Sequence, residues 1–144
     1  GRLSLAEVLP RRSQRLYALV TPKGLPEDAM EAWAAAEERI YARADDPMVN
    51  WESDDLRAAC EAAGLEVQHL ETVRQPRDML ITREQLARWF GDGAEGRPSY
   101  AEHLRQTLTD EQVERVRQVL AQQLVGQMVA WQSYVALLVA RRPA

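Results

Sequence analysis

Apolar residues recur at strand spacing in three stretches of the chain. In residues 2–8, RLSLAEV, Leu3 and Leu5 alternate with polar residues, and this period of two is typical of a β-strand. Residues 133–140, SYVALLVA, are apolar on both faces over most of their length, which favours an interior strand. A further strand, at about residues 65–72, follows a glycine that can end a helix. The pattern therefore predicts three strands, the first and last of which lie near the two ends of the sequence.

Helical spacing fills the segments between these strands. Residues 11–20 predict a short helix, and residues 26–44 predict a long one with Pro26 in its first turn. Four more helices are predicted from residues that can cap a helix start: Ser53, Thr82, Ser99 and Thr109. Residues 74–78, around Pro76, predict a loop. We expect an α/β fold in which about six helices cover a small sheet.

Length and composition fit one soluble globular domain. The chain has 144 residues, of which 46% are hydrophobic and 28% charged. We therefore expect residues 1–144 to form a single domain, with residues 11–43 as a helical insertion. Because the sequence starts inside a predicted strand, we also expect it to be a fragment of a longer protein.

Net charge and cysteine content indicate which partners and which cellular location to expect. A net charge of −4 argues against a general nucleic-acid binder, which is usually basic. Cys60 is the only cysteine, so no internal disulfide can form, and a reducing cytoplasmic location is the simplest interpretation. The most apolar stretch, residues 125–140, is too short and too polar to span a bilayer, so we expect no membrane partner.

Metal and nucleotide motifs are weak in this sequence. The glycine-rich run at residues 91–96 follows a predicted helix instead of a strand, so it fits a linker better than a phosphate loop. His69, His103 and Cys60 do not complete a metal-ligand pattern, and we predict no metal site. His69 has the strand parity of Val67, which predicts a partly buried structural histidine.

A basic group follows the first predicted strand. Ligands of open α/β sheets gather at the carboxyl ends of strands, so Glu7, Arg11 and Arg12 occupy a position where a substrate could bind. Trp33, Trp51 and Trp89 could line a pocket, with Trp51 on the substrate side, but aromatic residues at helical spacing more often belong to the core. The alternative for the arginines is a solvated helix face, because surface arginines are common. A further alternative is a phosphate or nucleic-acid contact through Arg11, Arg12 and Arg15, a partner that the net charge does not favour.

Three segments resemble the carboxyl-terminal half of a class I S-adenosylmethionine-dependent methyltransferase. GRLSLAEV, residues 1–8, resembles the fifth strand of that Rossmann-like fold. Residues 51–70, which contain DLRAACEAAGL, resemble a helix of the family and the sixth strand that follows it, and SYVALLVARRP, residues 133–143, resembles its seventh strand. The resemblance implies a mixed sheet in the order five, seven, six, with the last strand antiparallel in the middle.

The resemblance also limits what this chain can do. The family binds its cofactor through a glycine-rich turn and an acidic residue in its first half. Neither motif is present, so no cofactor-binding and no catalytic residue can be assigned, and S-adenosylmethionine is expected only if the missing half is supplied. The expected function is the substrate-side portion of a methyltransferase-like protein that is not catalytic alone. The alternative is a non-catalytic accessory or oligomerisation domain of a larger protein such as an ATPase.

The resemblance also indicates a partner. The first strand would lose its neighbour in such a half, and exposed strand edges tend to pair with another chain. We therefore expect either a homodimer or an association with the remainder of the parent protein.

Overall fold

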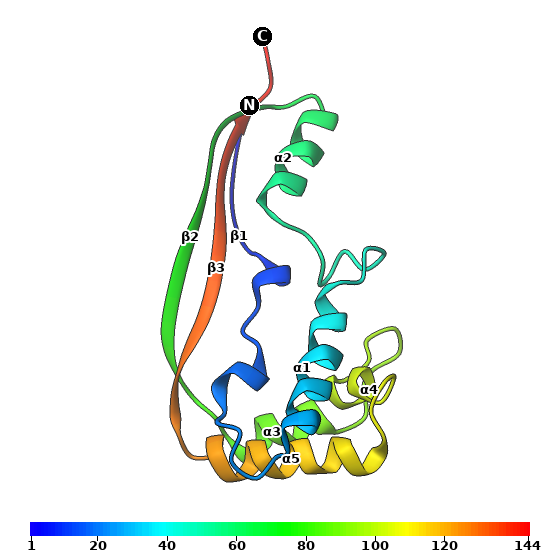
Figure 1. The fold of residues 1–144 in the computed structure, drawn as a ribbon. Coiled ribbons are helices and arrows are strands. Elements are labelled where there is room, and N and C mark those ends of the chain that lie inside the picture. Colours follow the sequence, from blue (N-terminus) through cyan, green and yellow to red (C-terminus); the bar gives the residue numbers. More distant parts are fainter. The chain divides into compact units, whose positions relative to one another are not determined.

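The computed structural model of the protein describes residues 1–144, as three strands, five α-helices and two short 3-10 helices (Figure 1). The elements in chain order are β1 (Arg2–Val8), η1 (Pro10–Arg12), η2 (Leu16–Leu19), α1 (Glu27–Tyr41), α2 (Ser53–Ala62), β2 (Glu66–Leu80), α3 (Arg83–Phe90), α4 (Tyr100–Leu104), α5 (Asp110–Leu124) and β3 (Met128–Arg141). The predicted α/β class is confirmed.

The chain divides into two compact units. The first, here called the sheet unit, comprises residues 1–14, 41–77 and 131–144. The second, the helical unit, comprises residues 15–40 and 78–130. Whether the two fold as one domain, with residues 11–43 as an insertion, stays a prediction.

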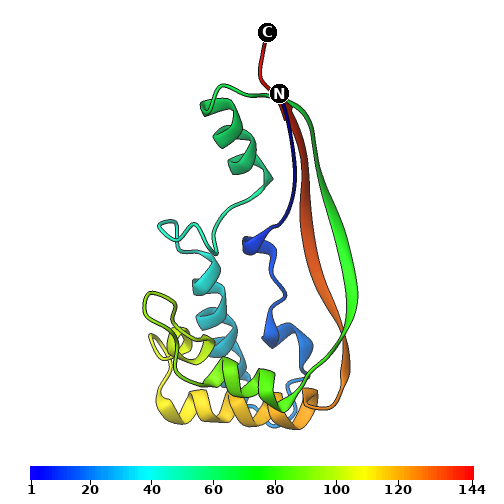
Figure 2. The same ribbon diagram turned by 180° about the vertical axis from the view of Figure 1, so that it is seen from behind.

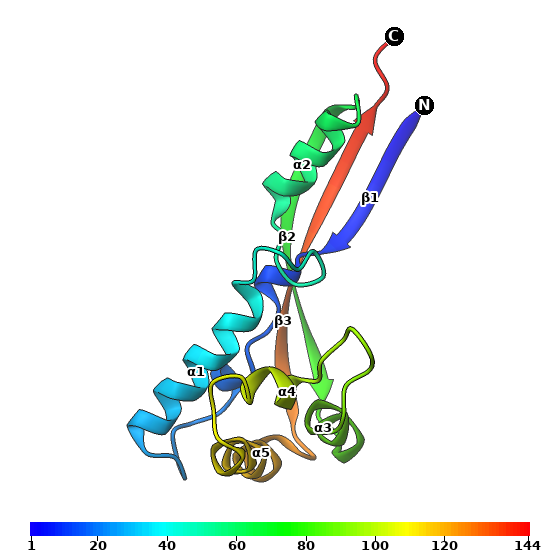
Figure 3. The same cartoon turned by 90° about the vertical axis from the view of Figure 1, so that its right-hand side faces the viewer.

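The sheet has the strand order β1-β3-β2, so the last strand of the sequence lies in the middle. β1 pairs with β3 in antiparallel fashion, from Arg2 opposite Arg141 to Val8 opposite Val135. The arrows of β1 and β2 run in the same direction, against that of β3 (Figure 3). The predicted order and the antiparallel central strand are therefore confirmed. Because β3 is antiparallel to both of its neighbours, the three strands form an antiparallel sheet, and the predicted mixed sheet would need a further strand parallel to one of them.

Two strands are longer than the sequence predicts. Residues 74–78, predicted as a loop, continue β2 to Leu80, and β3 begins at Met128 instead of residue 133. Pro76 is tolerated because β2 is an edge strand, where a missing N–H need not weaken the ladder. Side chains also tie this part of β2 to β3: Arg74 Nε donates to Gln132 Oε1 at 2.7 Å. The prediction of a loop was wrong because local sequence does not reveal which strand lies at an edge.

Helix α2 covers one face of the sheet unit (Figure 3). Its residues Leu56 and Cys60 pack with Leu138 and Ala140 of β3, together with Leu3, Leu5, Leu65, Val67 and Leu70. Cys60 is a buried free thiol in this core. The helix starts one residue earlier than predicted: Glu52 is the N-cap, and the Ser53 hydroxyl instead bonds Thr72 at 2.6 Å.

In the helical unit, three of the predicted N-caps are confirmed. The hydroxyls of Thr82, Ser99 and Thr109 each accept a hydrogen bond from the amide three residues later, at 3.1–3.2 Å. Helix α3 contacts both α4 and α5, and Figure 2 shows α3 and α5 from behind. The fully buried side chains of this unit include Trp33, Leu104 and Leu120.

The predicted helix at residues 11–20 was wrong. Its residues form the two 3-10 helices η1 and η2 instead. In the second of these, the amides of Leu16 and Tyr17 donate to the carboxylate of Glu37, at 2.8 and 3.3 Å. These N–H groups are therefore unavailable to an α-helical ladder, which needs them for the carbonyls four residues earlier.

Candidate functional site

The predicted substrate side lies where β1 ends. The Leu9 amide donates to the Tyr134 carbonyl at 2.8 Å, so the pairing of β1 with β3 extends to this fully buried residue. Pro10 then starts η1, because its fixed φ suits a helical turn and its missing N–H has no partner to lose. Arg11 and Arg12 therefore lie in η1, immediately after the carboxyl end of β1.

Both arginines contact the loop that precedes α2. Arg11 Nε donates to Asn50 Oδ1 at 2.6 Å. Arg12 Nε forms an ion pair with Glu52 Oε2 at 3.0 Å, and its guanidinium carbon lies 5.4 Å from the centre of the Tyr134 ring. The Arg12 guanidinium therefore contacts both an aromatic ring, that of Tyr134, and a carboxylate, that of Glu52.

The other two predicted residues differ in their surroundings. Trp51 is half-buried and stands in the loop between Asn50 and Glu52, so its backbone belongs to the same cluster as the arginines. Glu7 is exposed, lies opposite Ala136, and forms no ion pair. The structure therefore brings Arg11, Arg12 and the Trp51 segment together, while Glu7 stays on the strand.

The chemistry that this cluster offers is binding and positioning. Guanidinium, carboxamide, carboxylate and phenol groups surround the end of β1, and they can donate or accept hydrogen bonds. A ligand that approaches Arg12 competes with Glu52, but partly exposed ion pairs of this kind contribute only about 0–1 kcal/mol. Arg12 can therefore exchange its partner at little cost.

In the helical unit, Arg15 also has an acidic partner. Its Nε lies 2.7 Å from Glu38 Oε1, which also accepts a hydrogen bond from the Tyr17 hydroxyl at 2.7 Å. The arginine lowers the pKa of Glu38, and burial together with that hydrogen bond raises the pKa of Tyr17 to about 12. A phosphate contact through Arg15 would have to displace this carboxylate.

Sequence reasoning missed a buried polar network in the same unit. The Glu37 side chain is fully buried and accepts hydrogen bonds from the Leu16 and Tyr17 amides and, at 2.7 Å, from the Tyr100 hydroxyl. The Tyr100 hydroxyl in turn accepts from Trp33 Nε1 at 2.7 Å. Burial raises the pKa of Glu37. The available signal was its spacing: Glu37 lies four residues after Trp33, on the apolar face of α1.

Helices α3 and α5 line a cavity of about 620 Å³ with Leu86, Ala87, Phe90, Ala121 and Val125, and with Arg83 and Arg117. Arg117 is already bound by Glu114, whose pKa it lowers. None of the residues proposed from the sequence lies in this cavity.

The histidines and acidic residues form no group of three or more that could hold a metal ion. His69, which we expected to be partly buried, is instead 56% exposed, and its Nε2 lies 3.4 Å from Glu71 Oε2. It lies on the edge strand β2, which has a neighbouring strand on one side only.

No protein-family model matches the chain, and no curated protein matches it significantly. None of its helices is both long and apolar enough to cross a membrane.

Proposed function

We propose that this chain is the carboxyl-terminal, substrate-side portion of a methyltransferase-like protein and does not catalyse the reaction alone. The observation that carries the proposal is the strand order β1-β3-β2 with an antiparallel central β3. The resemblance of residues 1–8, 51–70 and 133–143 to such enzymes implies this arrangement, which local spacing alone does not favour over a simple meander.

The outer edge of β1 supports the same proposal. Leu9 occupies a hydrogen-bonded position of the β1–β3 register, and antiparallel strands alternate between bonded and non-bonded positions. The backbone groups of Ser4, Ala6 and Val8 therefore point away from β3, toward an edge that no strand of this chain occupies. An additional parallel strand from a cofactor-binding half would pair with these groups.

The cluster at the end of β1 has the location that a substrate-side role requires. In open α/β sheets, the carboxyl ends of the parallel strands border the ligand site. Arg11, Arg12 and the Trp51 segment lie at that end of β1. In the complete protein they would contact the methyl acceptor, while S-adenosylmethionine would bind residues outside this chain.

Calorimetric titration with S-adenosylmethionine tests the proposal. Residues 1–144 alone should show no binding in the micromolar range, and the protein extended by the residues encoded upstream of Gly1 should bind. Micromolar binding to the chain alone would contradict the assignment. An upstream sequence without a strand followed by a glycine-rich turn would also contradict it.

The second candidate function is a non-catalytic oligomerisation domain, and the free edge of β1 favours it as well. Amide hydrogen exchange separates the two. Ser4, Ala6 and Val8 should exchange rapidly in the isolated chain if this edge awaits a cofactor-binding half. Protection that rises with protein concentration, together with a dimer mass in sedimentation, would instead support self-association through β1.

A further inference from the structure

The opposite end of β1 carries a basic hollow that the proposed function does not use. It has a volume of about 660 Å³ and is lined by Gly1, Arg2, Gln68, His69, Val139, Arg141 and Arg142. All of these residues belong to the sheet unit. β1 has seven residues at about 3.3 Å each, so roughly 20 Å separates this hollow from the cluster around Arg12.

Two of the arginines lie directly opposite each other on the adjacent strands β1 and β3. The Leu9 amide donates to the Tyr134 carbonyl, and the Arg142 amide donates to the Gly1 carbonyl at 3.1 Å. These two backbone hydrogen bonds lie at opposite ends of the β1–β3 pairing and show which positions of its register are hydrogen-bonded. Arg2 and Arg141 are paired in that register, at a non-hydrogen-bonded position. Side chains are closest there, with Cα atoms about 4.5 Å apart, so the two guanidinium groups start from adjacent points on one face.

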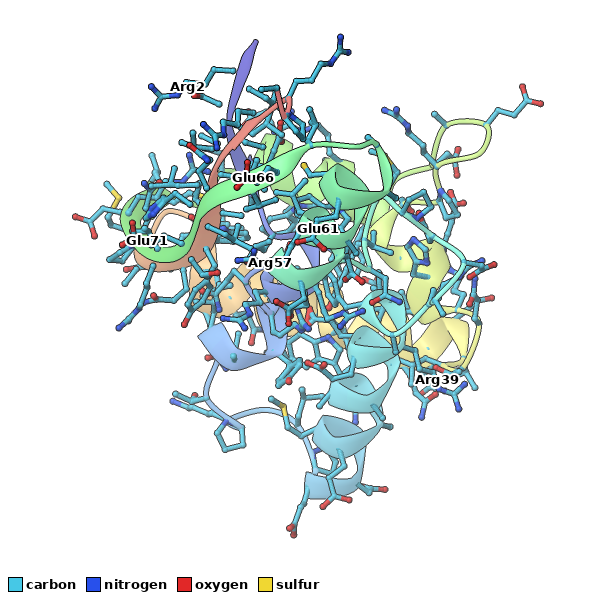
Figure 4. The ribbon with its side chains drawn as sticks, turned by 90° about the horizontal axis from the view of Figure 1, so that it is seen from above. Arg2, Arg39, Arg57, Glu61, Glu66 and Glu71 are labelled. Carbon is cyan, nitrogen blue, oxygen red and sulfur yellow. The ribbon has the colours of Figure 1, made fainter.

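Like charges directly opposite each other destabilise an antiparallel pair. Acidic groups that contact residues lining the hollow relieve this repulsion only in part: Glu66 pairs with Arg141 at 3.0 Å, and Glu71 Oε2 lies 3.4 Å from His69 Nε2. Arg2 and Arg142 form no ion pair. In Figure 4 the Arg2 side chain extends away from the start of β1, whereas Glu66 lies on β2. The hollow thus keeps two uncompensated positive charges in a protein whose net charge is −4.

We propose that this hollow binds a phosphate group. Guanidinium groups bind phosphate oxygens through paired hydrogen bonds, so several arginines around one depression suit a tetrahedral anion with more than one charge. Gln68 and His69, two residues whose side chains carry hydrogen-bonding groups, also line the hollow. The phosphate could belong to a small phosphorylated molecule or to a nucleic-acid backbone, and both sources share this chemistry.

The test uses pyrophosphate as the probe and residues 1–144 as the protein. Calorimetry at low ionic strength should show binding, and the backbone NMR signals of Gln68, His69 and Val139 should shift during the titration. The double variant Arg2→Ala/Arg142→Ala should weaken binding by about tenfold or more, because a lost charge-assisted hydrogen bond corresponds to roughly that factor. Arg141 is left in place, so its ion pair with Glu66 stays intact.

The matched control is Arg88→Ala/Arg115→Ala. It removes the same charge from exposed arginines of α3 and α5 that form no ion pair. This control should bind pyrophosphate as the unmodified protein does. An equal loss in both double variants would show that only net charge matters and would overturn the proposal, as would unchanged NMR signals around the hollow at saturating probe.

An oligonucleotide arm distinguishes the two sources. A fluorescent single-stranded oligodeoxythymidine that binds and is displaced by pyrophosphate indicates a nucleic-acid backbone, whereas pyrophosphate binding without oligonucleotide binding indicates a small phosphorylated ligand. Folding of each variant is verified by far-ultraviolet circular dichroism. In phosphate-free buffer Arg2→Ala should raise the Tm, since it removes the repulsion from Arg141. The hollow does not depend on the methyltransferase proposal, so either can fail without the other.

Discussion

The buried carboxylate of Glu37 gives the sharpest prediction about stability. Its oxygens accept hydrogen bonds from the Leu16 amide at 2.8 Å, the Tyr17 amide at 3.3 Å and the Tyr100 hydroxyl at 2.7 Å. Glu37→Ala leaves all three donors without this acceptor. Each buried unsatisfied donor costs about 1–3 kcal/mol, so three fully buried donors would cost about 3–9 kcal/mol. Because the Tyr17 amide and the Tyr100 hydroxyl are only partly buried, we expect the lower half of this range, roughly 3–6 kcal/mol, to be lost from the free energy of unfolding.

Glu37→Gln is the matched control because it keeps the shape of the side chain. Its carbonyl oxygen can take the place of Oε1, which accepts from both Leu16 and Tyr100. The side-chain NH₂ of the glutamine then faces the backbone N–H of Tyr17, and two donors cannot bond each other. Only the longest of the three hydrogen bonds is therefore lost. The loss should be about 1 kcal/mol or less, because the variant also no longer buries a charge.

The pH dependence of stability gives an independent check. Burial raises the pKa of Glu37 more than the hydrogen bonds from Tyr100, Leu16 and Tyr17 lower it. Between its ordinary and its raised pKa, Glu37 holds a proton in the folded state but not in the unfolded state. Its contribution is therefore fully present below the ordinary pKa and is lost as the pH rises through the raised one. Relative to Glu37→Gln, the unmodified protein should lose stability over this window.

Urea unfolding, followed by circular dichroism from acidic to neutral pH, measures both effects. Equal destabilisation by Glu37→Gln and Glu37→Ala would contradict a role for Glu37 as a hydrogen-bond acceptor. A difference in stability between the unmodified protein and Glu37→Gln that stays constant with pH would contradict a raised pKa of Glu37.

Three further predictions concern single local features. Gly64 has a φ of +77° after the end of α2, so Gly64→Ala should cost about 1 kcal/mol in thermal unfolding, and an unchanged Tm would argue against the left-handed conformation. Asp55 Oδ2 accepts from the Glu52 amide at 2.8 Å, so Asp55→Ala should cost about 0.5–2 kcal/mol in urea unfolding, whereas Asp55→Asn should lose less. Glu38→Gln should bring the pKa of Tyr17 down from about 12, but not fully to its ordinary value, because burial is the larger cause; alkaline absorbance titration measures this shift, and an unmoved pKa would exclude Glu38 as a cause.

Much of the fold could be predicted because its signals are local. The apolar alternation of residues 2–8 and the two-faced apolar run of residues 133–140 both became strands. The hydroxyls of Thr82, Ser99 and Thr109 cap helices where their spacing indicates. Capping needs only residues within one turn, so it can be predicted from sequence alone.

The missed features depend on partners far away in the sequence. Pro76 predicts a loop, yet it lies in β2. A proline is tolerated there because β2 forms an edge of the sheet. His69 has the strand parity of a partly buried residue, but the same edge leaves it exposed. Residues 11–20 do not form one helix, because the Glu37 carboxylate takes two of the amides that the helix needs.

The candidate site was only partly predictable for the same reason. The location of Arg11 and Arg12 after a strand pointed to the carboxyl end of β1, and both lie there. Their contacts with Asn50, Glu52 and Tyr134 join segments separated by about 40 residues or more, which no local pattern reveals.

Local sequence patterns were enough to predict the types of the main elements and the helix caps, because these depend on residues that are neighbours in the chain. The register of the sheet, and with it which charges meet, depends instead on tertiary packing. Arg2 and Arg141 lie at the two ends of the sequence, and a shift of one residue in the pairing of β1 with β3 would put them on opposite faces. The register is fixed by the burial of Leu3 and Leu5 against Leu138 and Ala140, so apolar packing places the basic hollow on the molecule.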